Sequence, residues 1–197
     1  AYVGNDPVNK YDPTGLCGTR KENYQDCRIN VEDRDSLSAD QLKSVETFET
    51  KIRETGAKIA EGGTDEEVAA WESITEFNIN PNRNDHDSPN ATATADVKGG
   101  SVNIWKTGVD SVTQFRNNPS GTLNGDSVAG HITIHEVYHF TATDIATRAA
   151  INPSAISAPL DRYNAEIRND RAAVAAGVRL GVLPPNYNGQ AYRIGHY

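Results

Sequence analysis

Residues 135–139 read HEVYH, and this short stretch constrains the fold more than any other part of the chain. Side chains four positions apart lie on one face of an α-helix, so His135 and His139 can both turn an imidazole nitrogen toward one metal ion. Glu136 is then held beside the metal without binding it, where a general base must stand to take a proton from a metal-bound water. The pattern therefore requires a helix at these residues.

The sequence before this motif favours a helix as well. Asp126 and Ser127 offer a polar helix start, and apolar residues follow at helical spacing: Val128, Ile132, Ile134 and Val137. We predict that the motif lies on this helix and that its histidines bind a metal ion. The alternative is a partly buried helix whose two histidines are only hydrogen-bonded.

A catalytic zinc ion usually takes three protein ligands and leaves one position for water, so a third ligand is needed. Residues 151–159 are rich in helix-breaking residues and can turn the chain back on itself. A second helix should follow, with Pro159 in its first turn and an end near Leu180. The apolar stripe that we expect to face the core consists of Leu160, Tyr163, Ile167, Val174 and Val178.

Two acids of this second helix are candidates for the metal site. Asp170 falls on the apolar stripe, and Glu166 lies one turn earlier on an adjoining line. An acid that faces the core is costly unless a cation or a hydrogen-bond donor meets it there. We predict that Glu166 is the third ligand and that Asp170 orients a ligand histidine through its other ring nitrogen. The alternative is that both acids form surface contacts with arginines of the same helix: Arg162, Arg168 and Arg171.

The two stretches together resemble the gluzincin metallopeptidases, whose pattern is HExxH followed on a later helix by ExxAD. Residues 166–170 read EIRND, so Asn169 replaces the alanine while the ligand and the supporting aspartate keep their places. The resemblance extends over residues 128–173. It implies a helix-rich α+β fold of the zincin type, with a small sheet beside the HExxH helix. It also implies Zn²⁺ as the cofactor and hydrolysis of peptide bonds in proteins, with Glu136 as the catalytic residue.

A second zinc-peptidase pattern fits the chain less well. The metzincin pattern HExxHxxGxxH takes its third ligand from the residue six past the second histidine, whereas Asp144 lies five past His139. The same pattern needs a glycine where Ala142 stands. Asp144 is therefore a weaker candidate than Glu166 for the third ligand.

The beginning of the chain carries an independent motif. Residues 1–16 read AYVGNDPVNKYDPTGL and resemble the end of the core of Rhs/YD-repeat proteins, whose last residues read YVGNDPVNxxDPxGL. The resemblance implies that residues 17–197 are a toxin domain carried inside a hollow β-shell that the core forms. Many family members cut themselves just after this motif, which would place a cleavage between Leu16 and Cys17, with Asp12 taking part.

The same resemblance implies a biological setting and partners for the chain. Toxins of this kind are effectors deployed between competing bacteria, for example by type VI secretion, and each is paired with an immunity protein. The parent core shell is the other implied partner. We expect delivery into a target bacterial cell, with the cytoplasm favoured over the periplasm and a protein of that cell as the substrate.

Composition argues against some classes of protein. The formal net charge is −8, whereas a protein that grips phosphates usually presents a basic face, so we expect no nucleic-acid partner. No run of about 18 apolar residues and no signal-peptide pattern occur, so we expect no membrane segment. A length of 197 residues allows one domain with a real core. Cys17 and Cys27 could close a short loop, but two cysteines do not define a redox compartment.

Two capping boxes predict helices before the metal-binding motif. Ser38 begins a helix with Gln41 three residues on, and this helix should run to about Glu61 and stop at the glycines 62–63. The stretch TDEE at residues 64–67 is the second box. Its helix should carry Val68, Trp71 and Ile74 and end at about Phe77.

Residues 78–100 are dominated by polar and turn-forming residues and predict a long loop. His86 lies in this loop between two aspartates, where the solvated interpretation is favoured over metal binding. Residues 101–105 alternate as in a strand, with Val102 and Ile104 on one face. In zincins an edge strand beside the metal helix lines the cleft and pairs with an extended substrate, so the resemblance makes 101–105 our candidate for that strand.

The sequence leaves two questions open. A zinc peptidase needs a group that stabilises the oxyanion, and the sequence offers four candidates without deciding between them: His131, Tyr163, Tyr192 and His196. Two other functions also remain possible. One is a zinc amidase that acts on peptidoglycan or another amide with the same ligands, and the other is a non-enzymatic domain that binds a partner or plugs the shell.

Overall fold

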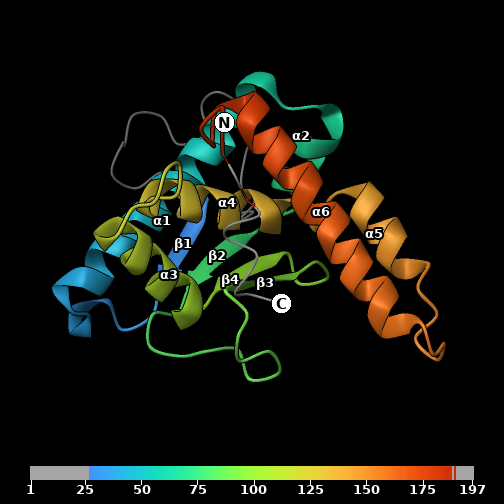
Figure 1. Ribbon diagram of the computed structural model, residues 1–197, viewed down its shortest axis with the longest axis horizontal. Helices are drawn as coiled ribbons and strands as arrows, with labels where there is room; N and C mark the ends of the chain where they lie inside the picture. Colours follow the sequence, from blue (N-terminus) through green and yellow to red (C-terminus); the bar gives the residue numbers. More distant parts are fainter. Residues whose placement is uncertain (1–26, 188, 190–197) are drawn as a thin grey trace, which may run out of the picture.

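The computed structural model describes residues 27–187 and 189 (Figure 1). Within this part of the chain the fold is α+β and rich in helix, as predicted. The N-terminal motif lies outside the described residues, and with it the candidate cleavage residues Asp12, Leu16 and Cys17. The elements in chain order are β1 Arg28–Val31, a short 3₁₀ helix Arg34–Ser36, α1 Ala39–Gly62, α2 Asp65–Glu72, β2 Glu76–Ile79, β3 Ala93–Asp96, β4 Ser101–Ile104, α3 Lys106–Asn117, α4 Gly125–Tyr138, α5 Ala142–Ala149 and α6 Ala158–Leu180.

The four strands form one mixed sheet in the order β1-β2-β4-β3. Strands β1, β2 and β4 run parallel, and α1 and α2 connect the first two. Strand β3 runs antiparallel to β4 and forms one edge of the sheet. The alternation of strand side chains gives this sheet one apolar face, which is fully buried and consists of Phe77, Ile79, Val102 and Ile104.

The opposite face of the sheet is polar. Asn30, Asn78 and Asn103 lie side by side at one level of the register. The amide of Asn30 donates to Asn78 at 2.8 Å, and the amide of Asn78 donates to Asn103 at 3.2 Å. This row ties the three parallel strands together on the face that does not pack on the core.

The strand predicted over residues 101–105 is present as β4, but its predicted place in the sheet is wrong. It lies inside the sheet between β2 and β3, so the edge strand next to the helices is β3. Strand β3 falls within residues 78–100, which the sequence predicted as a loop. Its four residues, ATAD, carry no large apolar side chain, and only the pairing with β4 marks them as a strand.

The end of the second predicted helix is also wrong. The capping box forms between Thr64 and Glu67 as expected, yet α2 ends at Glu72 instead of continuing to Phe77. The backbone N–H of Thr75 bonds to the carbonyl of Gly100, which starts strand β2. Apolar spacing of three or four residues fits a helix, but Phe77 and Ile79 also alternate as in a strand, and the tertiary pairing decides between the two.

Helix α4 is the central helix of the molecule and lies between α1 and α6 (Figure 1). Its N-cap is Asn124, whose side chain accepts from the backbone N–H of Ser127. Most of its residues are buried on all sides, as expected of a helix in the middle of a core.

Gly177 of α6 allows the close approach of the segment that contains Leu183, because a Cβ at Gly177 would lie 2.7 Å from a side-chain carbon of Leu183.

Helix α6 begins and ends where the sequence predicts, with proline in its first turn and Gly181 after its end in the left-handed conformation, at φ 77°. The predicted core-facing stripe is wrong in the first half of the helix, where Leu160 and Tyr163 are 60% and 47% exposed, whereas Val174 and Val178 pack against the core. The most deeply buried face consists of small or polar residues: Ala165, Asn169, Asp170, Ala173, Ala176 and Gly177. Where two helices pack closely, small residues are favoured at the contact. A stripe of large apolar residues then does not predict which face of the helix is buried.

Helix α5 was not predicted. It lies beside α6 at one side of the molecule (Figure 1), and its eight residues include one buried residue, Asp144. Within the described residues, none of the helices combines the length and the apolar character that crossing a membrane would need.

Candidate metal centre

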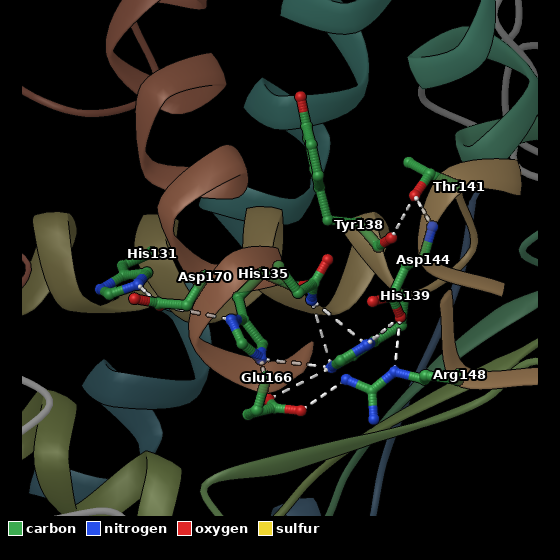
Figure 2. Close-up of polar contacts among 10 residues, drawn as sticks. His131, His135, Tyr138, His139, Thr141, Asp144, Arg148, Glu166 and Asp170 are labelled. Atoms are coloured by element: carbon green, nitrogen blue, oxygen red, sulfur yellow. Dashed lines mark hydrogen bonds and ion pairs between the residues drawn. The ribbon is translucent and has the colours of Figure 1, made fainter. Parts of the chain in front are cut away.

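Two histidines and a glutamate from two helices bring three donor atoms together (Figure 2). His135 lies in the last turn of α4, and His139 is the residue that caps this helix with helical backbone angles. Their Nε2 atoms are 3.2 Å apart. Glu166, from the middle of α6, places its Oε1 atom 2.8 Å from Nε2 of His135 and 3.5 Å from Nε2 of His139. The structure therefore brings together all three predicted ligands.

Each of the two histidines has a carboxylate at its other ring nitrogen. Nδ1 of His135 lies 3.3 Å from Oδ1 of Asp170, and Nδ1 of His139 lies 2.9 Å from Oδ2 of Asp144. When the proton of each neutral ring is on Nδ1, where a carboxylate can accept it, the lone pair is on Nε2. Three lone-pair atoms then face one another at short range, an arrangement that a bound cation or additional protons must stabilise.

The spacing of these atoms fits a four-coordinate metal ion. Ligands held at about 2.0–2.1 Å in a tetrahedron are about 3.3 Å from one another. The three observed separations are 2.8, 3.2 and 3.5 Å. Two imidazoles and one carboxylate oxygen therefore suit such an ion and leave one of its four positions without a protein ligand.

The charges around the site also favour a cation. Burial lowers the pKa of His135, but hydrogen bonds to Asp170 and Glu166 outweigh it and raise the pKa to about 10. Burial raises the pKa of Glu166, yet its hydrogen bonds to the two histidines outweigh burial and hold the pKa far below its ordinary value. The carboxylates around the histidines therefore favour positive charge at this site, and a divalent ion can supply it.

Glu136 has the surroundings expected of a general base. Its side chain is buried, and burial raises its pKa despite the opposing charges of the two histidines. Its Oε2 atom has no hydrogen-bond partner among the described residues. Buried carboxylate oxygens are rarely left without a partner. Glu136 lines a cleft beside the site, so a water molecule in this cleft can donate a hydrogen bond to Oε2.

A cleft of about 590 Å³ opens beside the three donor atoms. The metal-site residues line one side, and residues 88–95 and Val97 line the other. The backbone N–H of Trp105 donates to the carbonyl of Thr92, so Thr92 is hydrogen-bonded on the β4 side. Along an antiparallel pair of strands, every second residue is hydrogen-bonded to the neighbouring strand in this way. Ala93 and Ala95 therefore turn their main-chain N–H and C=O groups away from β4, toward the free edge of the sheet.

Two residues of α5 belong to the site although the sequence did not single them out for these roles. Asp144 is not in place as a direct ligand, the role for which it was weighed, because its carboxylate meets the outer ring nitrogen of His139. Arg148 donates from Nε to Oδ2 of Asp144 at 2.6 Å and from Nη2 to Oε2 of Glu166 at 2.5 Å. The spacing of four residues between Asp144 and Arg148 is the one sequence signal that could have suggested this pair.

The predicted role of Asp170 agrees with its position, and a third histidine shares it. Asp170 is 2% exposed, and Nε2 of His131 lies 2.6 Å from its Oδ1 atom. Nδ1 of His131 lies 2.9 Å from the hydroxyl of Tyr187. His131, one of the oxyanion candidates from the sequence, is among the residues that line the cleft, but it is only 2% exposed and both of its ring nitrogens have partners.

Two other groups of donor atoms also lie within 4.8 Å of one another. One combines His131 with His135 and Asp170, and the other combines Glu136 with the two motif histidines. The first would use a histidine whose nitrogens already have partners, and the second shares both histidines with the site above. All three groups share His135, so they mark one metal-binding region and not separate sites.

The remaining sequence candidates are resolved in part. Asp170 is 2% exposed, and Glu166 pairs with His135 and with Arg148 of α5, which differs from the surface contacts of the alternative. Asn169, which replaces alanine in the ExxAD pattern, is buried and donates to the backbone carbonyl of His135 at 3.3 Å. His86 is fully exposed, in agreement with its solvated interpretation. Tyr192 and His196 lie outside the described residues, as does Cys17.

None of the family models, curated proteins or solved structures with which the chain was compared matches it.

Proposed function

We propose that this chain is a zinc-dependent hydrolase that cleaves peptide bonds, with His135, His139 and Glu166 as the zinc ligands. The observation that carries the proposal is the convergence of two imidazole nitrogens and one carboxylate oxygen at 2.8–3.5 Å, with a carboxylate beside the other nitrogen of each histidine. Zinc is favoured among metals because two histidines and one glutamate are a ligand set of catalytic zinc sites.

The chemistry assigned to the protein's own residues is proton transfer. Zinc, when bound, supplies a Lewis acid and lowers the pKa of water at the position that the protein leaves open. Glu136 takes a proton from the attacking water while the water oxygen bonds to the carbonyl carbon. It then gives this proton to the leaving nitrogen as the C–N bond breaks.

An extended polypeptide is the substrate that suits the cleft. The outward main-chain groups of Ala93 and Ala95 can pair with such a chain through backbone hydrogen bonds, without regard to its side chains. The short alanine side chains leave room beside this edge. Strand β3 thus takes the role that the sequence gave to residues 101–105. These features support a protein or peptide substrate over a small amide.

We infer the biological setting from the N-terminal motif. The resemblance of residues 1–16 to the end of an Rhs core supports a toxin that is carried by such a core and delivered to a target bacterium. The proposed substrate is then a protein of the target cell, and the proposed partners are the core shell and a cognate immunity protein.

The experiment that tests the proposed function is the substitution Glu136→Gln. Glutamine keeps the size of the side chain but cannot accept the proton, so hydrolysis of denatured casein should fall by about 10²–10⁴-fold. Zinc content and thermal melting should not change. Asp126→Asn is the matched control, because Asp126 is an exposed acid on the same helix.

Expression in a sensitive bacterium provides a second readout. The wild type and Asp126→Asn should kill, and Glu136→Gln should be tolerated. Full killing by a folded, zinc-loaded Glu136→Gln protein would reject the hydrolase proposal.

A further inference from the structure

A hydrolase of this kind needs a donor for the carbonyl oxygen, which gains negative charge when water adds to its carbon. The described candidates from the sequence do not meet this need. His131 is buried with both nitrogens engaged. Tyr163 is not among the residues that line the cleft. Tyr138, which lies within the motif, donates its hydroxyl to Glu67 instead.

We propose that Arg148 is a catalytic residue whose Nη1 atom binds the carbonyl oxygen of the amide under attack and stabilises its negative charge. The proposal rests on the hydrolase function proposed above. Among the described residues that line the cleft, Arg148 alone is a lysine or an arginine. It therefore contributes the one fixed positive side-chain charge on that lining.

The guanidinium of Arg148 is held in place by two carboxylates. Nε donates to Asp144 at 2.6 Å and Nη2 donates to Glu166 at 2.5 Å. A guanidinium is planar and rigid, so two fixed nitrogens also fix the direction of the third. Donors that are oriented before the reaction stabilise a developing charge most effectively, because they need not reorganise during it.

The third nitrogen of Arg148 remains available. Nη1 has no hydrogen-bond partner among the described residues, and the side chain is 36% exposed. Figure 2 shows the side chain reaching from α5 past His139 toward Glu166. One oxygen of Glu166 binds Arg148 while the other faces the two histidines, so this single carboxylate joins the guanidinium to the proposed zinc position. Arg148 also lines the same cleft as His135, His139 and Glu136.

A purely positioning role for Arg148 is the alternative that the experiment must separate. In that case Arg148 would only hold Glu166 and Asp144, and its loss would act through zinc affinity. Arg148→Met removes the charge but keeps most of the aliphatic stem. Arg162→Met is the matched control, because Arg162 is an exposed arginine of α6 that does not line the cleft.

The first measurement is hydrolysis of denatured casein at saturating zinc. Arg148→Met should lower kcat by about 10²–10³-fold, the usual effect of losing one oxyanion donor. Arg162→Met should keep the kcat of the wild type. Added methylguanidine should restore part of the kcat of the smaller variant Arg148→Ala, and Arg148→Lys serves if Arg148→Met does not fold.

The second measurement does not depend on turnover. In the inactive Glu136→Gln background, calorimetry would follow binding of an Ala–Ala phosphinic dipeptide, whose phosphinate oxygens occupy the place of the charged carbonyl oxygen. Adding Arg148→Met to this background should weaken binding by about 10²-fold or more. Zinc affinity, measured by competition with a chromogenic chelator, serves as the reference.

The outcomes separate the two proposals. If the wild type does not hydrolyse casein and binds no zinc, the hydrolase proposal fails. If the wild type is active, but Arg148→Met keeps its kcat at saturating zinc and its affinity for the dipeptide, Arg148 is a positioning residue and the present inference is overturned.

Discussion

Asp144 accepts a hydrogen bond from Nδ1 of His139 at 2.9 Å, so the second histidine of the motif has a carboxylate of its own, as the first has in Asp170. Each carboxylate fixes the orientation of a ring and raises the basicity of its other nitrogen. The two come from different helices, α5 and α6, on either side of the residues 151–159 that join them. The metal position is thus held from three helices.

The first prediction is that Asp144→Asn weakens zinc binding by about 10–100-fold, the usual effect of losing such a partner. Asp170→Asn should have an effect of similar size. Competition with a chromogenic chelator measures both, with Asp161→Asn in the first turn of α6 as the control. A silent Asp144→Asn would mean that the contact with His139 does not support the metal.

The free edge of β3 gives the second prediction. Ala95→Pro removes an outward N–H that β4 does not use, and proline is tolerated at sheet edges. We expect KM for casein to rise several-fold while the fold is retained, because one main-chain bond to the substrate is lost. Ala95→Ser retains the N–H and should behave as the wild type. If the proline variant keeps the KM of the wild type, the substrate does not pair at this position.

The third prediction concerns Glu67 of α2, which accepts hydrogen bonds from Arg179 and from Tyr138 of the motif helix. Burial acts to raise the pKa of Glu67, but the hydrogen bonds from Arg179 and Tyr138 outweigh burial and lower it. A lowered folded-state pKa stabilises the protein above the unfolded pKa of about 4.3, and this stabilisation is lost as the pH falls through the folded value.

Glu67→Gln should therefore be less stable than the wild type at pH 7 by about 1–3 kcal/mol, the usual scale for hydrogen bonds to a charged group. The difference should narrow as the pH falls from 5 toward 3. Denaturant unfolding of both proteins across this range is the measurement. A constant difference at every pH would show that the charge of Glu67 is not responsible.

Gly177 gives the fourth prediction, because it allows the C-terminal segment to pack on α6. A Cβ at this position would lie 2.7 and 2.9 Å from two side-chain carbons of Leu183. Gly177→Ala should lower the free energy of unfolding by about 1–3 kcal/mol through overpacking. Gly62→Ala is the control, since its nearest neighbour would be 3.7 Å away. Equal stability of the two variants would contradict the packing account.

The sequence predicts those parts of the fold that depend on interactions between residues close together in the chain. The capping boxes at Ser38 and Thr64 form as expected, because their hydrogen bonds join residues only three positions apart. Pro159 likewise lies in the first turn of α6, and the helix ends at Leu180, as predicted. The histidine spacing of the motif, with the later acids Glu166 and Asp170, was sufficient to predict which donor atoms meet.

The parts that the sequence could not predict depend on partners far along the chain. Strand β3 has no strand pattern of its own and exists because it pairs with β4. The burial of Asn169 and Ala173 depends on how closely α6 approaches α4, which no single-helix pattern records. Arg148 enters the site only because α5 folds back beside α6.

The most direct test of the account is a crystal structure of the zinc-loaded protein, with anomalous scattering recorded on both sides of the zinc absorption edge. The account predicts one zinc peak, at about 2.0–2.2 Å from Nε2 of His135, Nε2 of His139 and Oε1 of Glu166. A zinc peak bound instead by His131 and Asp170, or no peak in a protein that still kills and still hydrolyses casein, would contradict it.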